Sequence, residues 1–231
     1  MNMFKIVATA IVGNALEAYD FVVYGLFSTT IAENFFPQQD KLTGILSAFG
    51  IFFLGYLARP LGALFFGRIG DTLGRKPALI ISIRLMAIST FAVGLLPDYH
   101  IVGVWAPLLL LVLRSLQGFS CGCELVGSIV FVVEHAPTTK RGFYGSFADA
   151  SAYLGILLAS LVAWVIHHGF SHAVVTHWAW RLPFVFGLLV GLSGWLMRRY
   201  VSETQLFNEN MRVPVPISTF TVNIGSECVL S

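Results

Sequence analysis

Charged side chains stand inside apolar runs of this sequence, where a lipid environment makes them costly. Glu17 and Asp20 lie three residues apart in the first run, and Arg114 lies in the fourth. Residues three apart share one face of a helix, so both carboxyls can face the same partner. A carboxyl whose protonation depends on an arginine partner can take up and release a proton within a membrane. The alternative is an ion pair that only fixes the register of two helices.

Polar residues at helical spacing accompany these charges. Two such stripes, on helices that otherwise face lipid, predict an aqueous cavity between the first and fourth runs. The rings of Tyr24 and Phe21 could hold a cationic group, although packing is the commoner role in a chain with 20 Phe. The candidate substrate and proton-coupling residues are Glu17, Asp20, Tyr24, Arg114, Gln117 and Glu124.

Further charges lie in the other apolar runs. Arg84 stands in the third run, and Asp149 stands early in the fifth. Arg59, Glu124 and Asp149 are expected nearer the cytoplasmic side, where they could form a network with Asp71 and Arg75. For Arg59 and Asp149 the alternative is snorkelling to the lipid head groups.

The composition is that of an integral membrane protein. The chain has 231 residues, of which 56% are hydrophobic and 11% charged, whereas soluble domains carry roughly 25% charge. A net charge of +2 gives no basic face for nucleic acid. The three cysteines lack metal-ligand spacing and imply no disulfide framework. The first apolar run contains Glu17 and Asp20, so it is predicted to be an uncleaved helix rather than a signal peptide.

Hydropathy and loop charges predict the fold and its orientation. A membrane helix needs about 20 mostly apolar residues, and turn or charge signals separate the runs. Eight lysines and arginines fall on the side of the N-terminus and two on the other, which places both termini in the cytoplasm. The prediction is an all-α membrane protein with six transmembrane helices at about 6–32, 42–66, 77–97, 101–133, 146–168 and 179–200.

The turn at residues 67–76 joins the second and third of these helices. It resembles the signature loop of major facilitator superfamily transporters, although Thr72 stands where that family usually has a basic residue. The resemblance implies a cytoplasmic gate built from this turn and from two residues after the fourth helix. The residues concerned are Gly67, Asp71, Gly74, Arg75, Lys76, Glu134 and Arg141.

Other segments resemble the metabolite:proton symporter family within that superfamily. The matching segments are Gly13 to Phe21 with Tyr24-Gly25, Arg59-Pro60-Leu61-Gly62, Arg114-x-x-Gln117-Gly118, Glu134 with Arg141-Gly142, Trp180-Arg181-x-Pro183-Phe184, and Glu203-Thr204 with Phe207. The resemblance implies proton symport of a small polar solute across a bacterial inner membrane, without enzyme activity, cofactor or metal. A zwitterion such as proline or betaine is the first candidate, and a small carboxylate such as citrate or 2-oxoglutarate is the second. The resemblance also implies that Arg114 is a central cation with Glu17 and Asp20 as its acidic partners.

The family has about twelve helices in two halves, with the substrate site between them. Residues 1–207 correspond to the N-terminal half, and residues 208–231 are predicted to be a polar tail, disordered or frameshifted. We expect a truncated product that is inactive alone. The alternatives are a homodimer, a chain that works with a partner half, and a non-transporting regulatory protein.

Two readings from other classes have weaker support. The segment Gly118-Phe119-Ser120-Cys121-Gly122 matches the Gly-x-Ser-x-Gly pattern and suggests a rhomboid-like intramembrane serine protease, but the sixth helix has no histidine to act as a base. His168 and His172 are four apart and could bind a metal, although scattered loop histidines are commoner. The spacing of a phosphate-binding Walker loop is absent from residues 70–76.

Overall fold

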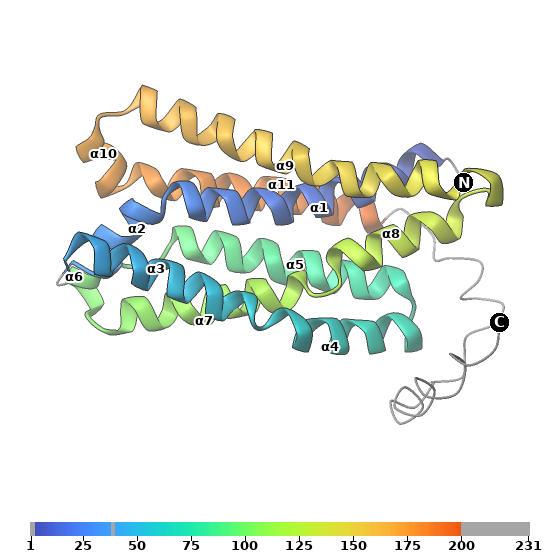
Figure 1. The fold of residues 1–231 in the computed structure, drawn as a ribbon, viewed down its shortest axis with the longest axis horizontal. Helices are drawn as coiled ribbons and strands as arrows, with labels where there is room; N and C mark the ends of the chain where they lie inside the picture. The colour runs from blue at the N-terminus through green and yellow to red at the C-terminus, as the bar shows by residue number, and fades with distance from the viewer. Residues whose placement is uncertain (1–2, 38–39, 200–231) are drawn as a thin grey trace, which may run out of the picture.

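The computed structural model describes residues 3–37 and 40–199, and within these ranges it contains helices and turns but no strand. The predicted tail at 208–231 and the motif residues Glu203, Thr204 and Phe207 lie outside the described residues. Two short 3-10 turns, Thr138–Lys140 and Ala179–Arg181, precede α9 and α11. The helices in Figure 1 are α1 Met3–Leu26, α2 Ser28–Phe35, α3 Lys41–Tyr56, α4 Arg59–Thr72, α5 Arg75–Gly94, α6 Tyr99–Val102, α7 Trp105–Cys121, α8 Glu124–His135, α9 Arg141–Gly169, α10 His172–His177 and α11 Leu182–Arg199.

Six stretches of the described chain are long and apolar enough to cross a membrane, which confirms the predicted all-α fold with six membrane helices. The first predicted helix, 6–32, is interrupted at Phe27, where α1 gives way to α2. The second, predicted at 42–66, continues to Thr72. The six stretches are Ile6–Leu26, Lys41–Thr72, Arg75–Gly94, Trp105–His135, Thr138–Gly169 and Ala179–Arg199.

Two of the six spans are broken near their middle. α3 ends at Tyr56 and α4 begins at Arg59, with Pro60 in its first turn. Because proline has no N–H to donate, it cannot continue the hydrogen-bond ladder of the preceding helix. The span α7–α8 is interrupted at Gly122 and Cys123.

The two broken spans touch backbone to backbone through glycines. A Cβ on Gly62 would overlap the carbonyl of Phe119, and one on Gly118 would overlap the carbonyl of Gly55. A Cβ on Gly55 would lie 2.7 Å from the carbonyl oxygen of Arg114. Small residues let membrane helices approach closely. This contact fixes α7 against α3, and so fixes the height of Arg114 in the bundle.

The helices run roughly along one axis, with α1 near the centre of the bundle (Figure 1). α1 packs against α9, α11 and α8, while α5 packs against α11 and α7. We call the end that carries the turn at residues 67–76 the loop end. The opposite end, with α2, α6 and α10, is called the histidine end.

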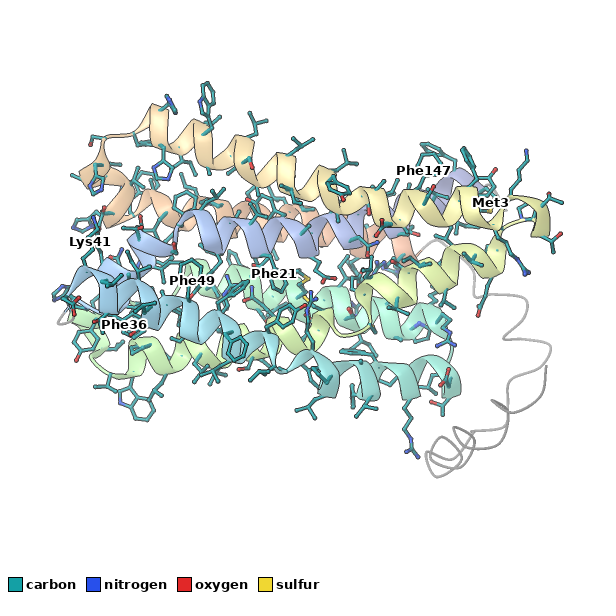
Figure 2. All side chains as sticks on the ribbon, viewed as in Figure 1. Met3, Phe21, Phe36, Lys41, Phe49 and Phe147 are labelled. Atoms are coloured by element: carbon teal, nitrogen blue, oxygen red, sulfur yellow. The ribbon has the colours of Figure 1, made fainter. Side chains whose placement is uncertain are left out.

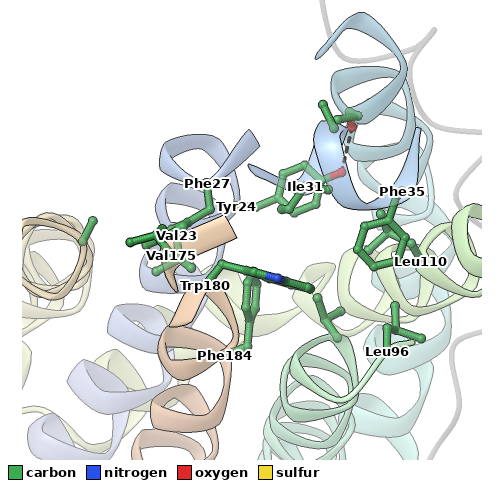
Figure 3. Close-up of a cluster of buried hydrophobic side chains, with 14 of the residues drawn as sticks. Val23, Tyr24, Phe27, Ile31, Phe35, Leu96, Leu110, Val175, Trp180 and Phe184 are labelled. Carbon is green, nitrogen blue, oxygen red and sulfur yellow. Dashed lines mark hydrogen bonds between the residues drawn. The ribbon is translucent and has the colours of Figure 1, made fainter. Parts of the chain in front are cut away.

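Aromatic side chains pack the interior near the histidine end. Trp180 and Phe184 face Phe35 and Leu110 across the bundle, and all four are buried (Figure 3). The ring centroids of Trp180 and Phe35 are 5.9 Å apart. This cluster closes the interior of the bundle between the histidine end and the central charges.

Candidate functional site

The charge pair at the centre of the bundle joins α1 to α7. Arg114 Nη1 donates to Asp20 Oδ2 at 2.8 Å, and the two side chains are 3% and 1% exposed. Asp20 Oδ1 accepts from Gln117 Nε2 at 2.8 Å and from Thr90 Oγ1 at 3.0 Å. The structure therefore brings together the predicted residues Asp20, Arg114 and Gln117, and their role in transport stays a prediction.

Thr90 is the member of this network that sequence reasoning missed. It comes from α5, and its hydroxyl also accepts a hydrogen bond from Gln117 Nε2 at 2.8 Å. A single threonine in an apolar helix gives no signal of its own, because its hydroxyl usually bonds to the backbone of its own helix. With Thr90 included, the central network links three of the six spans.

Arg114 has donors that no described residue uses. Its guanidinium lies 3.9 Å from the ring centroid of Tyr24, whose hydroxyl donates to the carbonyl of Ala48 at 2.8 Å. The buried Nε and Nη2 of Arg114 make no hydrogen bond to another described residue, and neither does Gln117 Oε1. Buried donors of this kind normally have a partner, so the arginine has the capacity to bind an additional acceptor.

Glu17 has a different partner from the one predicted. It pairs with Arg59 of α4 rather than with Arg114. Residues three apart on a helix point about 60° apart, so Asp20 faces α5 and α7 while Glu17 faces α4. Two aromatic rings flank Arg59, with its guanidinium 4.7 Å from the centroid of Phe21 and 4.6 Å from that of Tyr56.

The Glu17–Arg59 pair lines an open cavity of about 360 Å³. Phe21 reaches this region from α1 and contacts Tyr56, with ring centroids 6.0 Å apart (Figure 2). Glu17 Oε2 and Arg59 Nε are buried without a hydrogen bond to a described residue. The cavity is lined by Glu17, Tyr56, Leu57, Arg59, Pro60, Ala63, Cys121, Gly122, Leu125 and Val126. One carboxylate, one guanidinium and the face of a phenol ring are thus accessible from one cavity.

Glu124 does not face the cavity. It forms an ion pair with Arg198 of α11, with the two side chains 1% and 4% exposed, and Ser82 donates to Glu124 Oε2 at 2.8 Å. Arg198 also donates to the carbonyl of Leu79 at 2.6 Å. A Cβ on Gly13 would overlap both charged groups, so only glycine leaves room for them beside α1. The break between α7 and α8 turns Glu124 away from the stripe that contains Arg114.

The residues of the predicted loop-end network do not form one connected set of ion pairs in the described part of the chain. Asp71 pairs with Arg75 at 3.0 Å, one turn apart across the turn between α4 and α5. Gly74 makes that turn with φ 111°, a conformation that favours glycine. Asp149 is exposed and, among the described residues, has no ion-pair partner. The expected single network with Arg59 and Glu124 is therefore not formed in this structure.

The remaining residues of the predicted gate are Gly67, Lys76, Glu134 and Arg141. Lys76 Nζ donates to the carbonyl of Arg199 at 3.1 Å. Within the described ranges Glu134 and Arg141 form no ion pair, and Arg141 is exposed at the start of α9. A Cβ on Gly67 would meet nothing within 4 Å. Their assignment to a gate stays a prediction.

The structure gives the protease and metal alternatives no support. Ser120 is fully buried and donates its hydroxyl to the carbonyl of Gln117 at 2.7 Å within α7. At the histidine end, His167 stacks on Phe27 and His168 Nδ1 contacts the carbonyl of Trp164 at 3.0 Å. In the part of the chain that the structure describes, no group of three or more His, Cys, Asp or Glu side chains is arranged to hold a metal ion.

The chain is similar to known membrane transporters along most of its length. The family model described as sugar (and other) transporter matches residues 6–208. The proline/betaine transporter of Escherichia coli (strain K12) is 41% identical over 207 residues, which cover 90% of this chain and 41% of that protein. The citrate-proton symporter of Klebsiella pneumoniae is 38% identical over 195 residues, which cover 84% of this chain and 44% of that protein.

A solved structure shares the fold. The proton:xylose symporter XylE of the major facilitator superfamily, bound to 6-bromo-6-deoxy-D-glucose, matches with a TM-score of 0.80 at 19% identity, covering 91% of this chain and 47% of that one. At this identity the match concerns the arrangement of helices alone. The chain spans less than half the length of these relatives.

Proposed function

We propose that this chain, which belongs to the sugar (and other) transporter family of the major facilitator superfamily, forms one six-helix half of a proton-coupled carrier for a small polar solute. The carrier would lie in a bacterial inner membrane with the loop end and both termini in the cytoplasm, as the loop charges favour. The observation that carries the proposal is the buried Asp20–Arg114 pair, which joins two membrane spans within their length. A buried charge pair in this position is the default mark of a proton or ion pathway.

Proton coupling follows from competition for Arg114. While Asp20 is ionised, its carboxylate holds Nη1 of the arginine at 2.8 Å. A proton that binds to Asp20 removes this charge and leaves the guanidinium free to bind an anionic group of the solute. Loss of the proton restores the ion pair and expels that group. The unused Nε and Nη2 donors of Arg114 give the solute a place to bind.

The cavity beside Glu17 favours a zwitterion as the solute. There a carboxylate and two aromatic rings surround the chain's own guanidinium, that of Arg59. The cationic end of a proline or betaine molecule can replace that guanidinium, because ring faces attract quaternary and secondary ammonium groups. Its carboxylate end is then the anionic group that binds Arg114. A citrate-like anion would be repelled by Glu17, and it is therefore the second candidate.

A second six-helix body would complete the site. The cavity is open, and large apolar side chains are exposed on the surface of the bundle, among them Phe53 on α3 at 60%, Leu64 on α4 at 67% and Leu157 on α9 at 66%. A partner chain that supplies the other half is the first candidate, and a second copy of this chain is the next. A regulatory protein that carries no solute is the remaining alternative.

Solute uptake distinguishes these candidates. The chain is expressed alone and together with the C-terminal remainder of the E. coli proline/betaine transporter, and uptake of labelled proline, glycine betaine and citrate is measured in vesicles with an imposed proton gradient. We expect gradient-driven proline or betaine uptake with the partner half, and none from Asp20→Asn. Asp40→Asn is the control, since Asp40 is exposed outside the spans. Uptake by the chain alone would favour a homodimer, and no uptake in any combination would contradict the carrier function.

A further inference from the structure

Arg84 is a membrane-span cation that neither the central pair nor the cavity uses. It lies in the middle of α5, is exposed, and forms no ion pair with another described residue. Its guanidinium lies 4.8 Å from the ring centroid of Trp195 on α11. The cavity beside Glu17 has no lining residue from α5 or α11, so Arg84 belongs to a different surface.

That surface is otherwise apolar. On α5 the neighbours of Arg84 at helical spacing are Ile81 and Ile88, which are 42% and 63% exposed. On α11 the residues Leu192 and Leu196, which are one helical turn apart, are 45% and 41% exposed. α5 and α11 pack closely against each other, and in Figure 1 they lie side by side behind α1. Aliphatic stripes of this kind face the acyl chains of a bilayer.

The guanidinium of Arg84 reaches toward the loop end. Arg84 is nine residues after Arg75, which is about 14 Å along the helix. Long side chains on a helix point back toward its N-terminus, which here is the loop end. Trp195 lies in the last turns of α11, and the exposed Arg199 follows one turn later. The contact between Lys76 Nζ and the carbonyl of Arg199 holds these two helix ends together.

We propose that the surface formed by Arg84, Trp195 and Arg199 binds the phosphodiester head group of an anionic phospholipid in the leaflet at the loop end. Guanidinium groups bind phosphate oxygens in a two-pronged geometry, and tryptophan side chains favour the membrane interface. Neither Arg84 nor Arg199 has a described carboxylate partner. The single negative charge of a lipid such as phosphatidylglycerol offsets one of these two positive charges, and its phosphate oxygens can accept hydrogen bonds from both guanidinium groups. A zwitterionic lipid brings a cation that these arginines repel.

Brominated lipids test the proposal, because bromine quenches the fluorescence of a tryptophan that it touches. The full chain is placed in mixed micelles with phosphatidylglycerol or phosphatidylcholine brominated on the acyl chain. The signal of Trp195 is the difference between the wild-type chain and Trp195→Phe, which keeps an aromatic ring. A cation near the surface contributes about fivefold in preference for anionic lipid. We expect Trp195 to be quenched at a several-fold lower fraction of phosphatidylglycerol than of phosphatidylcholine.

Charge variants identify the group responsible. Arg84→Gln should lower the preference for phosphatidylglycerol about fivefold, whereas Arg84→Lys should keep most of it. Arg68→Gln removes the same charge from the exposed face of α4 and should leave the preference unchanged. Circular dichroism spectra establish that each variant keeps its helices. If Arg84→Gln does not fold, the comparison of Trp195 quenching by the two lipids in the wild-type chain still tests the proposal.

Three results would overturn the proposal. Equal quenching of wild-type Trp195 by the two lipids would show that this surface has no charge preference. An unchanged preference in Arg84→Gln would show that this arginine does not bind the head group. Displacement of the brominated lipid by inorganic phosphate would assign the surface to a soluble anion instead.

Discussion

Removing one partner of the Glu124–Arg198 pair should destabilise the bundle strongly. The pair is buried, with the side chains 1% and 4% exposed, and it ties α8 to α11. In Arg198→Met, Glu124 keeps the hydroxyl of Ser82 but loses the cation that pairs with it in the described part of the chain. Leaving a buried charge without its partner costs about 3–5 kcal/mol. The expected loss of unfolding free energy is therefore in this range for Arg198→Met and for Glu124→Met.

The double variant separates pairing from packing. Replacing both partners with methionine removes both charges from the interior, and such replacements are often neutral or stabilising. The two losses should therefore not add, and the coupling energy should reach about 3 kcal/mol or more. Unfolding free energies are measured on the full chain in detergent by titration with sodium dodecyl sulfate, followed by circular dichroism.

A pair at the histidine end provides the matched control. Arg181 and Asp98 lie 2.6 Å apart but are 22% and 20% exposed. Ion pairs with access to solvent contribute about 0–1 kcal/mol, so Arg181→Met should cost far less than Arg198→Met. Equal costs in the two variants, or additive losses in the Glu124–Arg198 cycle, would refute the claim that burial makes this pair important.

Three further predictions concern the helix ends and helix contacts. Gly118→Val places a side chain where the backbone of the neighbouring helix lies and should prevent folding of the bundle, whereas Gly67→Ala, which meets nothing within 4 Å, should be tolerated; melting temperatures compare the two. Gly74→Ala at φ 111° and ψ 159° should cost about 1–3 kcal/mol, measured by the same detergent titration. The pKa of Asp40 is lowered by hydrogen bonds from Thr43, so this carboxylate stabilises α3 above its unfolded pKa and the contribution is lost as the pH falls through the folded pKa. Asp40→Ala should therefore lower the melting temperature at neutral pH and have no effect in strong acid, and a difference that persists in acid would contradict this account.

The sequence predicted the contact between Asp20 and Arg114 because depth in a membrane helix can be counted from its ends. Residue counting placed both side chains near the middle of their spans, and the structure places them 2.8 Å apart. Residue counting could not decide whether Glu17 or Asp20 is the partner of Arg114. That choice depends on the rotation of α1 relative to α7, which packing contacts from other helices determine.

Arg198 is the clearest residue that the sequence did not identify. A cation at the end of a helix is usually a loop charge that sets the orientation in the membrane. Arg198 is one of the eight lysines and arginines that fall on the side of the N-terminus in the sequence. The glycine at position 13 makes the difference, because it leaves room for the guanidinium beside α1. From the sequence alone, a glycine on one helix does not indicate that a charged side chain of another helix packs against it.

The break at Gly122 and Cys123 explains the misplacement of Glu124. A continuous helix would have kept this residue on the face of Arg114 and Gln117, as the spacing predicted. No proline marks the interruption, and glycine alone is common within membrane helices. The spacing of polar residues alone therefore could not predict the direction in which the Glu124 side chain points.

The central claim is that a proton binds to Asp20 when the anionic group of the solute takes the place of the Asp20 carboxylate at Arg114. The most direct measurement is proton uptake from a lightly buffered solution when proline or glycine betaine is added to the chain purified together with the C-terminal remainder of the E. coli proline/betaine transporter. The account predicts about one proton taken up for each solute bound, and binding without proton uptake in Asp20→Asn. Solute binding to the wild-type protein without proton uptake, or unchanged uptake in Asp20→Asn, would contradict it.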